Sequence, residues 1–353
     1  MSRLDNPRIG LTFDDVLLVP RRSSVRSRRD VSLRTRVTRN VGLELPMIAA
    51  NMDTVCEAEM AVAMARLGGL GVIHRFLPIE EHADQVRQVK KQSAGLLVGA
   101  AVGTDHDMAE RAERLVEAGV DVLVLDIAHG HAEHALAGVR DLKRRFPGVD
   151  VIAGNVATAA GALDLVEAGA DAVKVGVGPG GVCTTRLVAG VGVPQLTAID
   201  DVVSAEPGVP VIADGGIRTS GDIAKALAVG ADTVMIGSLF AGTKESPGEV
   251  EQSPHGLVKR YRGMASREAA EKRAERHGVD LDDEYFEQRS PEGVEGTVPY
   301  RGEVGKIVGT LVGGLKSSMS YLDARDLETF RSNADFVRVT PAGLTENRPH
   351  ATL

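Results

Sequence analysis

The sequence predicts a closed barrel of eight parallel β-strands with helices between them, and three observations support this fold class. Short runs rich in β-branched residues alternate with longer segments in which apolar residues recur every three or four positions. Eight such runs can be counted, which is the number that closes a (β/α)8 or TIM barrel. Three joints between a helix and the next strand repeat one pattern, in which a glycine is followed two residues later by an aspartate.

The elements follow one another in a regular order along the chain. Strands are expected at Pro46–Ala50, Leu70–His74, Leu96–Val102, Val120–Ala128, Val151–Val156, Ala172–Val177, Pro210–Gly215 and Thr233–Ser238. Helices are expected at Glu57–Leu67, Ile79–Lys91, Met108–Ala118, His134–Phe146, Ala159–Ala168 and Gly221–Val229. The competing fold, a doubly wound sheet, would need a glycine fingerprint after the first strand, and Asn51-Met52-Asp53 is not one.

The repeated joints explain how each helix stops. They lie at 118–121 (AGVD), 168–171 (AGAD) and 229–232 (VGAD). Glycine directly after a helix adopts the left-handed cap conformation at little cost, and the aspartate then opens the next strand. The recurrence indicates one repeated unit, so residues 1–353 are expected to form a single barrel domain.

Composition excludes several classes of function. The net charge is −8 and the basic residues are scattered, whereas a nucleic-acid surface needs a basic stripe. No apolar run approaches the roughly 20 residues that span a bilayer, and the N-terminus lacks the apolar core of a signal peptide. The two cysteines, Cys56 and Cys183, lie far apart in unlike contexts, so we expect no disulfide framework and a cytoplasmic protein.

The chain beyond the eighth strand departs from the repeat. Residues 242–299 are long, charged and poor in apolar periodicity, and we expect them to form a mobile flap over the barrel mouth with a short surface helix at Glu268–Arg276. Val304–Leu315 and Leu327–Arg331 are expected to be closing helical turns, and Phe336–Thr340 a further short strand.

The barrel predicts where chemistry takes place, because catalytic groups lie at the C-terminal ends of barrel strands and in the loops that follow. Residues 176–186 (GVGPGGVCTTR) form such a loop after the sixth strand. Its glycines let the backbone approach a ligand closely, and its carbonyls can ligate a monovalent cation. A thiol here is accessible, so Cys183 is a candidate nucleophile, whereas Cys56 opens an apolar helix and fits a buried structural role.

Loops after the seventh and eighth strands of barrels commonly bind phosphate through backbone N–H groups. Here they contain Asp214-Gly215-Gly216 and Gly237-Ser238. A carboxylate beside a phosphate would be repelled, so Asp214 is expected to bind a ribose hydroxyl instead.

These stretches and others resemble the IMP dehydrogenase and GMP reductase family over nearly the whole chain. The motifs that carry the resemblance are 11–20 (LTFDDVLLVP), 51–54 (NMDT), 71–75 (GVIHR), the cysteine loop, 213–216 (ADGG), 261–264 (YRGM), 291–293 (PEG) and 336–340 (FVRVT).

The resemblance implies a role for each matching residue. Cys183 would attack C2 of a purine mononucleotide, and Thr185 and Glu292 would be the other catalytic residues. Substrate would be held by Asn51, Met52, Gly181, Asp214, Gly216, Gly237, Ser238, Tyr261, Gly263 and Met264. The cofactor, NADPH or alternatively NAD+, would contact Asp126, Asn155, Gly176 and Arg289, and K+ would bind the carbonyls of Gly178, Gly180 and Cys183. The resemblance also implies a homotetramer.

The two branches of the family differ in the flap. Glu284 stands at the position where the dehydrogenases share an arginine that activates water. Residues 289–293 (RSPEG) resemble the corresponding reductase segment, in which the glutamate assists the departure of ammonia. His74-Arg75, 241–243 (AGT) and the tail 342–346 (AGLTE) look more like dehydrogenases.

Two further features bear on the branch and the substrate. The regulatory CBS module that many dehydrogenases carry is missing, because Lys91 is followed by Leu96 after four residues. Gly181 replaces a serine common in the family, which is compatible with a modified GMP analogue as substrate.

We therefore expect reductive deamination of GMP or such an analogue to IMP and ammonia. Oxidation of IMP to XMP is the alternative. A purine-nucleotide-binding protein without turnover is a second alternative, which the joint presence of Cys183, Thr185 and Glu292 disfavours.

Overall fold

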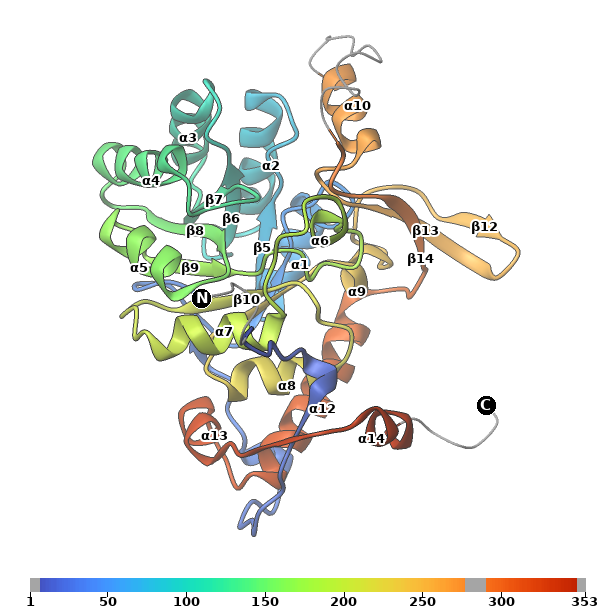
Figure 1. Ribbon diagram of the computed structural model, residues 1–353. Helices are drawn as coiled ribbons and strands as arrows, with labels where there is room; N and C mark the ends of the chain where they lie inside the picture. Colours follow the sequence, from blue (N-terminus) through green and yellow to red (C-terminus); the bar gives the residue numbers. More distant parts are fainter. Residues whose placement is uncertain (1–6, 277–289, 348–353) are drawn as a thin grey trace.

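Eight parallel strands close into a barrel in the computed structural model, which describes residues 7–276 and 290–347 (Figure 1). The barrel strands are β4 (Met47–Ala49), β5 (Leu70–Ile73), β6 (Val98–Val102), β7 (Val122–Asp126), β8 (Asp150–Val156), β9 (Ala172–Val175), β10 (Val211–Asp214) and β11 (Thr233–Ile236). Each expected strand is present, although most are shorter than the sequence pattern predicts. The barrel closes where β11 pairs with β4 in parallel.

Helices surround the barrel and bury their apolar faces against it. They are α1 (Ala58–Arg66), α2 (Ile79–Gln92), α3 (Met108–Glu117), α4 (Glu133–Arg145), α5 (Ala159–Glu167), α7 (Gln195–Ser204), α8 (Ser220–Ala228) and α12 (Val304–Tyr321). α7 has no counterpart among the predicted helices, and α12 continues beyond its predicted end at Leu315. The gap between α2 and β6 holds five residues, 93–97, so no module is inserted there.

The eighth barrel helix comes from far along the chain. Only the short α9 (Ser238–Ala241) follows β11 directly, and α12 packs against both α8 and α1. The flap is thus an insertion between the last barrel strand and the helix that completes the ring. In Figure 1 its elements project from one side of the barrel.

The flap contains regular structure that the sequence analysis did not predict. β12 (Glu251–Ser253), β13 (Gly256–Arg262) and β14 (Glu295–Pro299) form an antiparallel sheet, and α10 (Arg267–Arg276) follows β13. These strands were missed because their burial does not alternate simply, and β14 is largely exposed. The helix prediction is confirmed to within one residue.

The remaining elements tie the chain ends to the barrel. β1 (Val16–Leu18) pairs antiparallel with β15 (Phe336–Arg338), and β2 (Thr35–Arg36) pairs with β3 (Gly42–Leu43). Short 3-10 turns lie at Phe13–Asp15 and Arg28–Asp30, while α6 (Thr185–Val188), α13 (Leu327–Asn333) and α14 (Pro341–Glu346) complete the described elements. Among the described helices, none has the length and apolarity needed to cross a membrane.

The glycine-aspartate joints have the predicted structure. Gly119, Gly169 and Gly230 have φ angles of 92°, 109° and 124°, which confirms the left-handed cap. The aspartates do more than open a strand, because Asp121, Asp171 and Asp232 accept hydrogen bonds from the amides of Val98, Val151 and Val211 at 2.8, 2.9 and 2.8 Å. Each carboxylate therefore binds the start of the preceding barrel strand and fixes the two strands in register.

Replacing Asp171 with alanine tests this interpretation. The carboxylate is nearly buried and also pairs with the Lys143 ammonium at 2.7 Å, so its loss removes the acceptor of a buried amide and leaves the cation without its counter-charge. We expect the free energy of unfolding to fall by about 2–3 kcal/mol, measured by calorimetry or urea titration. The control is Glu44→Ala, which removes an exposed ion pair with Arg34 and should change little. Equal losses in both variants would contradict the assignment.

Candidate active site

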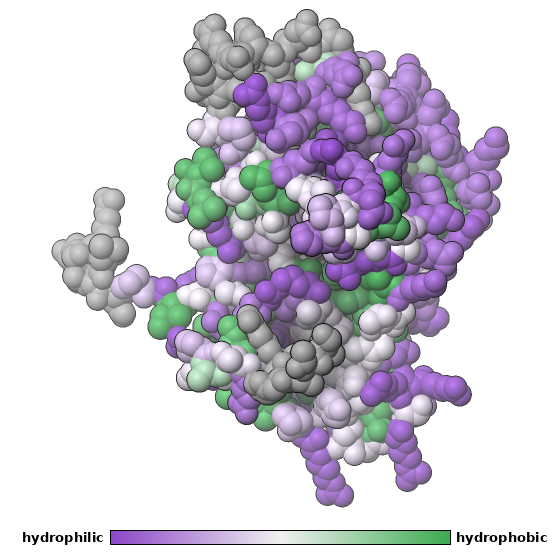
Figure 2. All heavy atoms as spheres, turned by 90° about the vertical axis from the view of Figure 1, so that its right-hand side faces the viewer, coloured by the Kyte–Doolittle hydropathy of each residue, from purple (hydrophilic) through white to green (hydrophobic). Residues whose placement is uncertain are grey.

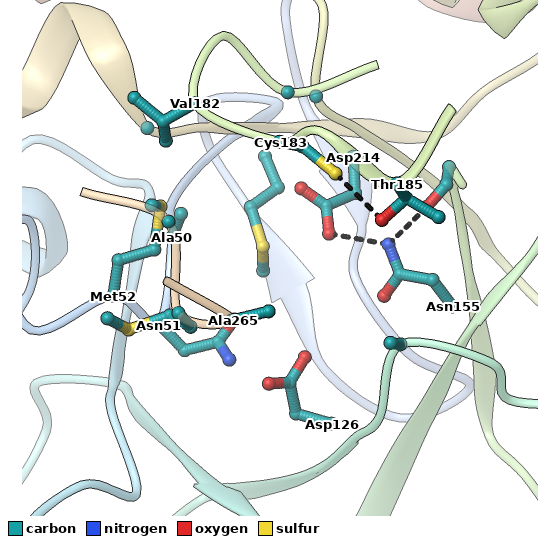
Figure 3. A pocket seen from close by; sticks show the side chains of 18 of the residues that line it. Ala50, Asn51, Met52, Asp126, Asn155, Val182, Cys183, Thr185, Asp214 and Ala265 are labelled. Carbon is teal, nitrogen blue, oxygen red and sulfur yellow. Dashed lines mark hydrogen bonds between the residues drawn. The ribbon is translucent and has the colours of Figure 1, made fainter. Parts of the chain in front are cut away.

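A cavity of about 440 Å³ opens at the C-terminal ends of the barrel strands. Its wall is made by the loops after β4, β5, β7, β9, β10 and β11, by Asn155 in β8, and by residues of the flap. Figure 3 shows Cys183, Thr185, Asp214, Asn155 and Asp126 with their side chains around this space. The barrel therefore places its polar side chains where the sequence analysis expected a site.

The cysteine loop follows β9 and depends on glycine. Gly176 and Gly178 have φ angles of 152° and 84°, and a Cβ on Gly176 would lie 2.1 Å from the carbonyl oxygen of Asp214. No other residue can therefore bring this loop so close to the end of β10. The loop leads to Cys183, which is half-buried, and then into α6.

Cys183 lies beside a hydroxyl. Its Sγ is 3.2 Å from the Oγ1 of Thr185, within hydrogen-bonding reach for sulfur. Figure 3 shows this pair next to Asp214. A thiol in a cavity wall, with a neighbouring hydroxyl, has the geometry of a nucleophile whose reacting group can exchange a proton with its neighbour.

The base of the flap is paired with the cysteine loop. The amide of Thr184 donates to the carbonyl of Glu292 at 2.9 Å, and the amide of Val294 donates to the carbonyl of Val182 at 3.0 Å. These bonds form an antiparallel bridge between Cys183 and Gly293. Glu292 consequently lines the same cavity as Cys183, although 109 residues separate them in the sequence.

An ion-pair network fixes the flap to the first barrel loop. Arg262 is nearly buried and binds both carboxylate oxygens of Asp53, the closer at 2.6 Å from its Nη2. Its Nη1 donates to Glu295 at 3.0 Å. Since Glu295 begins β14, three residues after Glu292, this network also limits where Glu292 can lie.

Tyr261 closes the wall between the flap and the last strand. Its hydroxyl lies 3.8 Å from the Sδ of Met52, and a Cβ on Gly237 would come within 2.7 Å of that hydroxyl. Burial, and then the charges of Asp214 and Cys183, raise the pKa of the Tyr261 phenol. The phenol therefore stays protonated at neutral pH and is able to donate a hydrogen bond.

Lys174, which was assigned no role from the sequence, also lines the cavity. Its side chain is 2% exposed, and its Nζ lies 2.6 Å from Asp214 Oδ2 and 3.3 Å from Asp126 Oδ1, with Asn155 Oδ1 as a further partner. It sits in a strand of otherwise apolar residues, and a lone lysine in such a run was the available signal. Arg75 also lines the cavity and was not assigned a role.

Most of the residues assigned from the sequence meet at this cavity. Those that line it are Asn51, Met52, Asp126, Asn155, Gly176, Gly178, Gly180, Cys183, Thr185, Asp214, Gly237, Tyr261, Gly263, Met264 and Glu292. Gly181, Gly216 and Ser238 do not line it, although each adjoins a residue that does. A Cβ on Gly216 would face the ring of Phe13 at 3.4 Å. Arg289, like Glu284, lies outside the described residues.

The two thiols should differ sharply in reactivity. Cys56 is fully buried, and burial raises the pKa of its thiol, so it stays protonated and inaccessible in the folded protein. Iodoacetamide at pH 8 should therefore label one thiol per chain, with mass spectrometry placing the label on Cys183. Labelling should vanish in Cys183→Ala, and rapid native labelling of Cys56 would contradict the structure.

Comparison with known proteins identifies the family. Residues 10–350 match the family described as IMP dehydrogenase / GMP reductase domain. Inosine-5'-monophosphate dehydrogenase from Cryptosporidium parvum is 45% identical over 390 residues, covering 97% of this chain and 95% of that protein. GMP reductase from Leishmania major is 38% identical over 476 residues, covering 97% and 96%.

A solved structure agrees with both matches. It is a cysteine-to-alanine variant of GMP reductase from Trypanosoma brucei in complex with guanosine 5'-monophosphate, with a TM-score of 0.93 and 38% identity over 100% of both chains. The chain therefore belongs to the IMP dehydrogenase / GMP reductase family and is a purine-nucleotide oxidoreductase of that family.

Proposed function

We propose that the protein catalyses the NADPH-dependent reductive deamination of GMP, or of a modified GMP analogue, to IMP and ammonia. The observation that carries the proposal is the backbone pairing that brings Glu292 into the cavity of Cys183 and Thr185. A nucleophile, a hydroxyl and a carboxylate then stand together at one reacting carbon, which is what displacement of an amino group requires.

The Cys183 thiolate would add to C2 of the guanine ring, forming a C–S bond. The exocyclic amino group would leave from the same carbon as ammonia, after accepting a proton. A hydride would then add to C2, and breaking the C–S bond would return the electron pair to sulfur and release IMP. NADPH supplies that hydride when it is bound. Splitting the exchange at C2 into two steps is the general advantage of covalent catalysis.

Thr185 and Glu292 would move the proton that the departing amine needs. The Thr185 hydroxyl, 3.2 Å from the Cys183 sulfur, is close enough to pass a proton toward the group leaving C2. Glu292 would serve as the acid and base behind it. The ion pairs of Arg262 and the pairing with the cysteine loop keep this carboxylate at the cavity.

The nucleotide would be recognised by the loops after β4, β10 and β11 and by the flap. Asp214 would accept hydrogen bonds from ribose hydroxyls, and backbone N–H groups of Gly216, Gly237 and Ser238 would hold the phosphate. Asn51, Met52, Gly263, Met264 and Tyr261 would surround the base. Gly181 leaves open space, because a Cβ there would meet nothing within 4 Å.

The donor groups also fit the proposed cofactor and cation. One carboxylate oxygen of Asp126 accepts a hydrogen bond from Lys174, and the other has no partner among the described residues. That second oxygen could accept a hydrogen bond from a cofactor ribose hydroxyl, beside Asn155 and Gly176. The carbonyls of Gly178 and Cys183 accept no hydrogen bond from described residues, so with the Gly180 carbonyl they could hold K+. Arg289, in the undescribed segment, is a further proposed cofactor contact.

Oxidation of IMP to XMP with NAD+ is the second candidate. Relatives such as those from Cryptosporidium parvum and Borreliella burgdorferi, 45% and 42% identical, carry the name inosine-5'-monophosphate dehydrogenase. The Cys183 thiolate would add to C2 of IMP, and that carbon would then give up its hydride, which NAD+ accepts when it is bound. Water would then displace the sulfur from C2 and release XMP. Glu284 in place of a water-activating arginine favours the reductase direction.

We also propose a homotetramer. Large apolar side chains are exposed on α6, in the loop after it and on the flap, including Leu187 at 87%, Val191 at 60% and Leu257 at 50%. Figure 2 shows apolar patches separated by polar residues on the face where the flap lies. Burial of such side chains against another copy would stabilise an assembly.

Turnover of purified protein tests the direction. With GMP, NADPH and K+, we expect loss of NADPH absorbance together with stoichiometric IMP and ammonia. Cys183→Ala should abolish turnover while still binding GMP in calorimetry, which would also exclude a binding protein without catalysis. Production of XMP and NADH from IMP and NAD+, with no consumption of NADPH, would overturn the reductase assignment.

Glu292→Gln tests the proposed proton transfer to the departing amino group. The amide keeps the size of the side chain but cannot donate or accept the proton, so kcat should fall about 100- to 10,000-fold. The KM for GMP should change little, because the binding loops stay intact. The matched control is Glu295→Gln, which weakens the ion pair with Arg262 and should cost stability more than kcat. Unchanged kcat in Glu292→Gln would exclude the proposed proton transfer.

A further inference from the structure

The buried ammonium of Lys174 has no role in the chemistry described above. Burying a cation costs several kcal/mol unless it is well paired, and an apolar side chain of similar size often stabilises such a position better. Lys174 is the third residue of β9, whose four residues are all buried. Packing alone therefore does not explain a lysine at this point of the barrel.

The lysine binds the ends of three other strands. Its Nζ contacts Asp126 at the end of β7, Asn155 in β8 and Asp214 at the end of β10. Burial lowers the pKa of the lysine, but the charges of Asp214 and Asp126 outweigh it and the pKa is raised overall. The group is an ammonium at neutral pH, and it holds two carboxylates at one point.

Each carboxylate keeps one oxygen available. Asp214 receives Lys174 and the Nδ2 of Asn155 on Oδ2, and its Oδ1 has no partner among the described residues. Asp126 receives Lys174 on Oδ1, and its Oδ2 likewise has no partner in the described part of the chain. Both residues line the cavity, and Figure 3 shows Asp214 beside Cys183 and Asp126 farther along the wall.

The Asn155 amide completes the arrangement. Its Oδ1 accepts from Lys174, while its Nδ2 donates to Asp214 at 2.9 Å and to the carbonyl of Gly176 at 2.8 Å. One end of the amide is thus bound to the cation and the other end to the carboxylate and the start of the cysteine loop. A shift of Lys174 would move all of these groups together.

We propose that Lys174 is a positioning residue that joins the ribose site of the nucleotide to the ribose site of the dinucleotide through one ammonium group. This inference rests on the proposed function, which gives Asp214 to the nucleotide and Asp126 to the cofactor. Hydride transfer needs the two reacting carbons aligned, and misplacement by about 1 Å can cost on the order of 100-fold in rate. A single cation bound to both carboxylates sets that alignment without touching either ring.

The test is Lys174→Met, which keeps the length and removes the charge. We expect the KM for GMP and the KM for NADPH each to rise about tenfold or more, since each carboxylate loses a charged hydrogen bond, and kcat to fall about 100-fold. Lys174→Arg, which restores the cation, should recover part of both losses. A purely structural residue would show a lower melting temperature with unchanged KM values.

Lys143→Met is the matched control. Lys143 also pairs with a strand-end aspartate, Asp171 at 2.7 Å, but at the opposite rim of the same barrel. Its loss should lower the melting temperature and leave both KM values within about twofold, because that rim of a barrel serves stability.

Three results would overturn the inference. They are unchanged KM values in Lys174→Met, a rise for only one of the two ligands, or equal kinetic losses in Lys143→Met. If Lys174→Met does not fold, Lys174→Gln and Lys174→Arg decide the same comparison. If the unaltered protein turns over no nucleotide pair, the proposed function fails, and calorimetric affinities for GMP and NADP+ in the Lys174 variants decide the inference separately. IMP and NAD+ replace them if the dehydrogenase direction is found.

Discussion

Closure of the barrel is the constraint on which the remaining structure depends. Once β11 pairs with β4, the C-terminal ends of all eight strands lie on one rim, and residues at or after the ends of seven of them line the same cavity. The helix that seals this closure, α12, lies after the flap in sequence, packed between α8 and α1. The flap must therefore leave the rim after β11 and return to it, which brings its base over the cavity.

The base of the flap is joined to the cysteine loop by backbone pairing. Hydrogen bonds between 182–184 and 292–294 bind the flap to the loop that carries Cys183. Arg262 adds a charged connection to Asp53 in the first barrel loop. Because Glu292 lies in the paired segment, movement of the flap base would change the distance between carboxylate and thiol. The folded position of the insertion therefore also sets where Glu292 lies relative to Cys183.

The sequence was sufficient for the barrel because periodicity and caps are local. Gly119, Gly169 and Gly230 end helices through their own positive φ angles, so these helix ends can be predicted without knowing any distant residue. The flap strands β12–β14 could not be predicted this way, because β13 pairs with β14, which lies beyond α10 in the sequence. Most of the candidate site followed from the rule that loops after barrel strands converge. Lys174 was missed because a lysine within a strand has meaning only when Asp126 and Asp214 are seen around it.

The charged side chains that line the cavity limit which groups could bind a phosphate there. Among the described residues that line it, Asp126, Asp214 and Glu292 are acidic. The two basic ones are already bound, Lys174 by carboxylates and Arg75 by Asp105 at 2.9 Å. In this wall a nucleotide phosphate would therefore meet only side-chain cations that already pair with carboxylates.

Backbone N–H groups and the Tyr261 hydroxyl are the donors left for such a phosphate, and the backbone groups reach it only where the chain approaches closely. Gly215 and Gly216 have φ angles of 91° and 81°, and a Cβ on Gly237 would collide with the Tyr261 hydroxyl. Replacing any of these glycines would move the donors themselves. Nucleotide affinity in this protein should accordingly depend on backbone conformation more than on side-chain charge, and its dependence on salt should be weak.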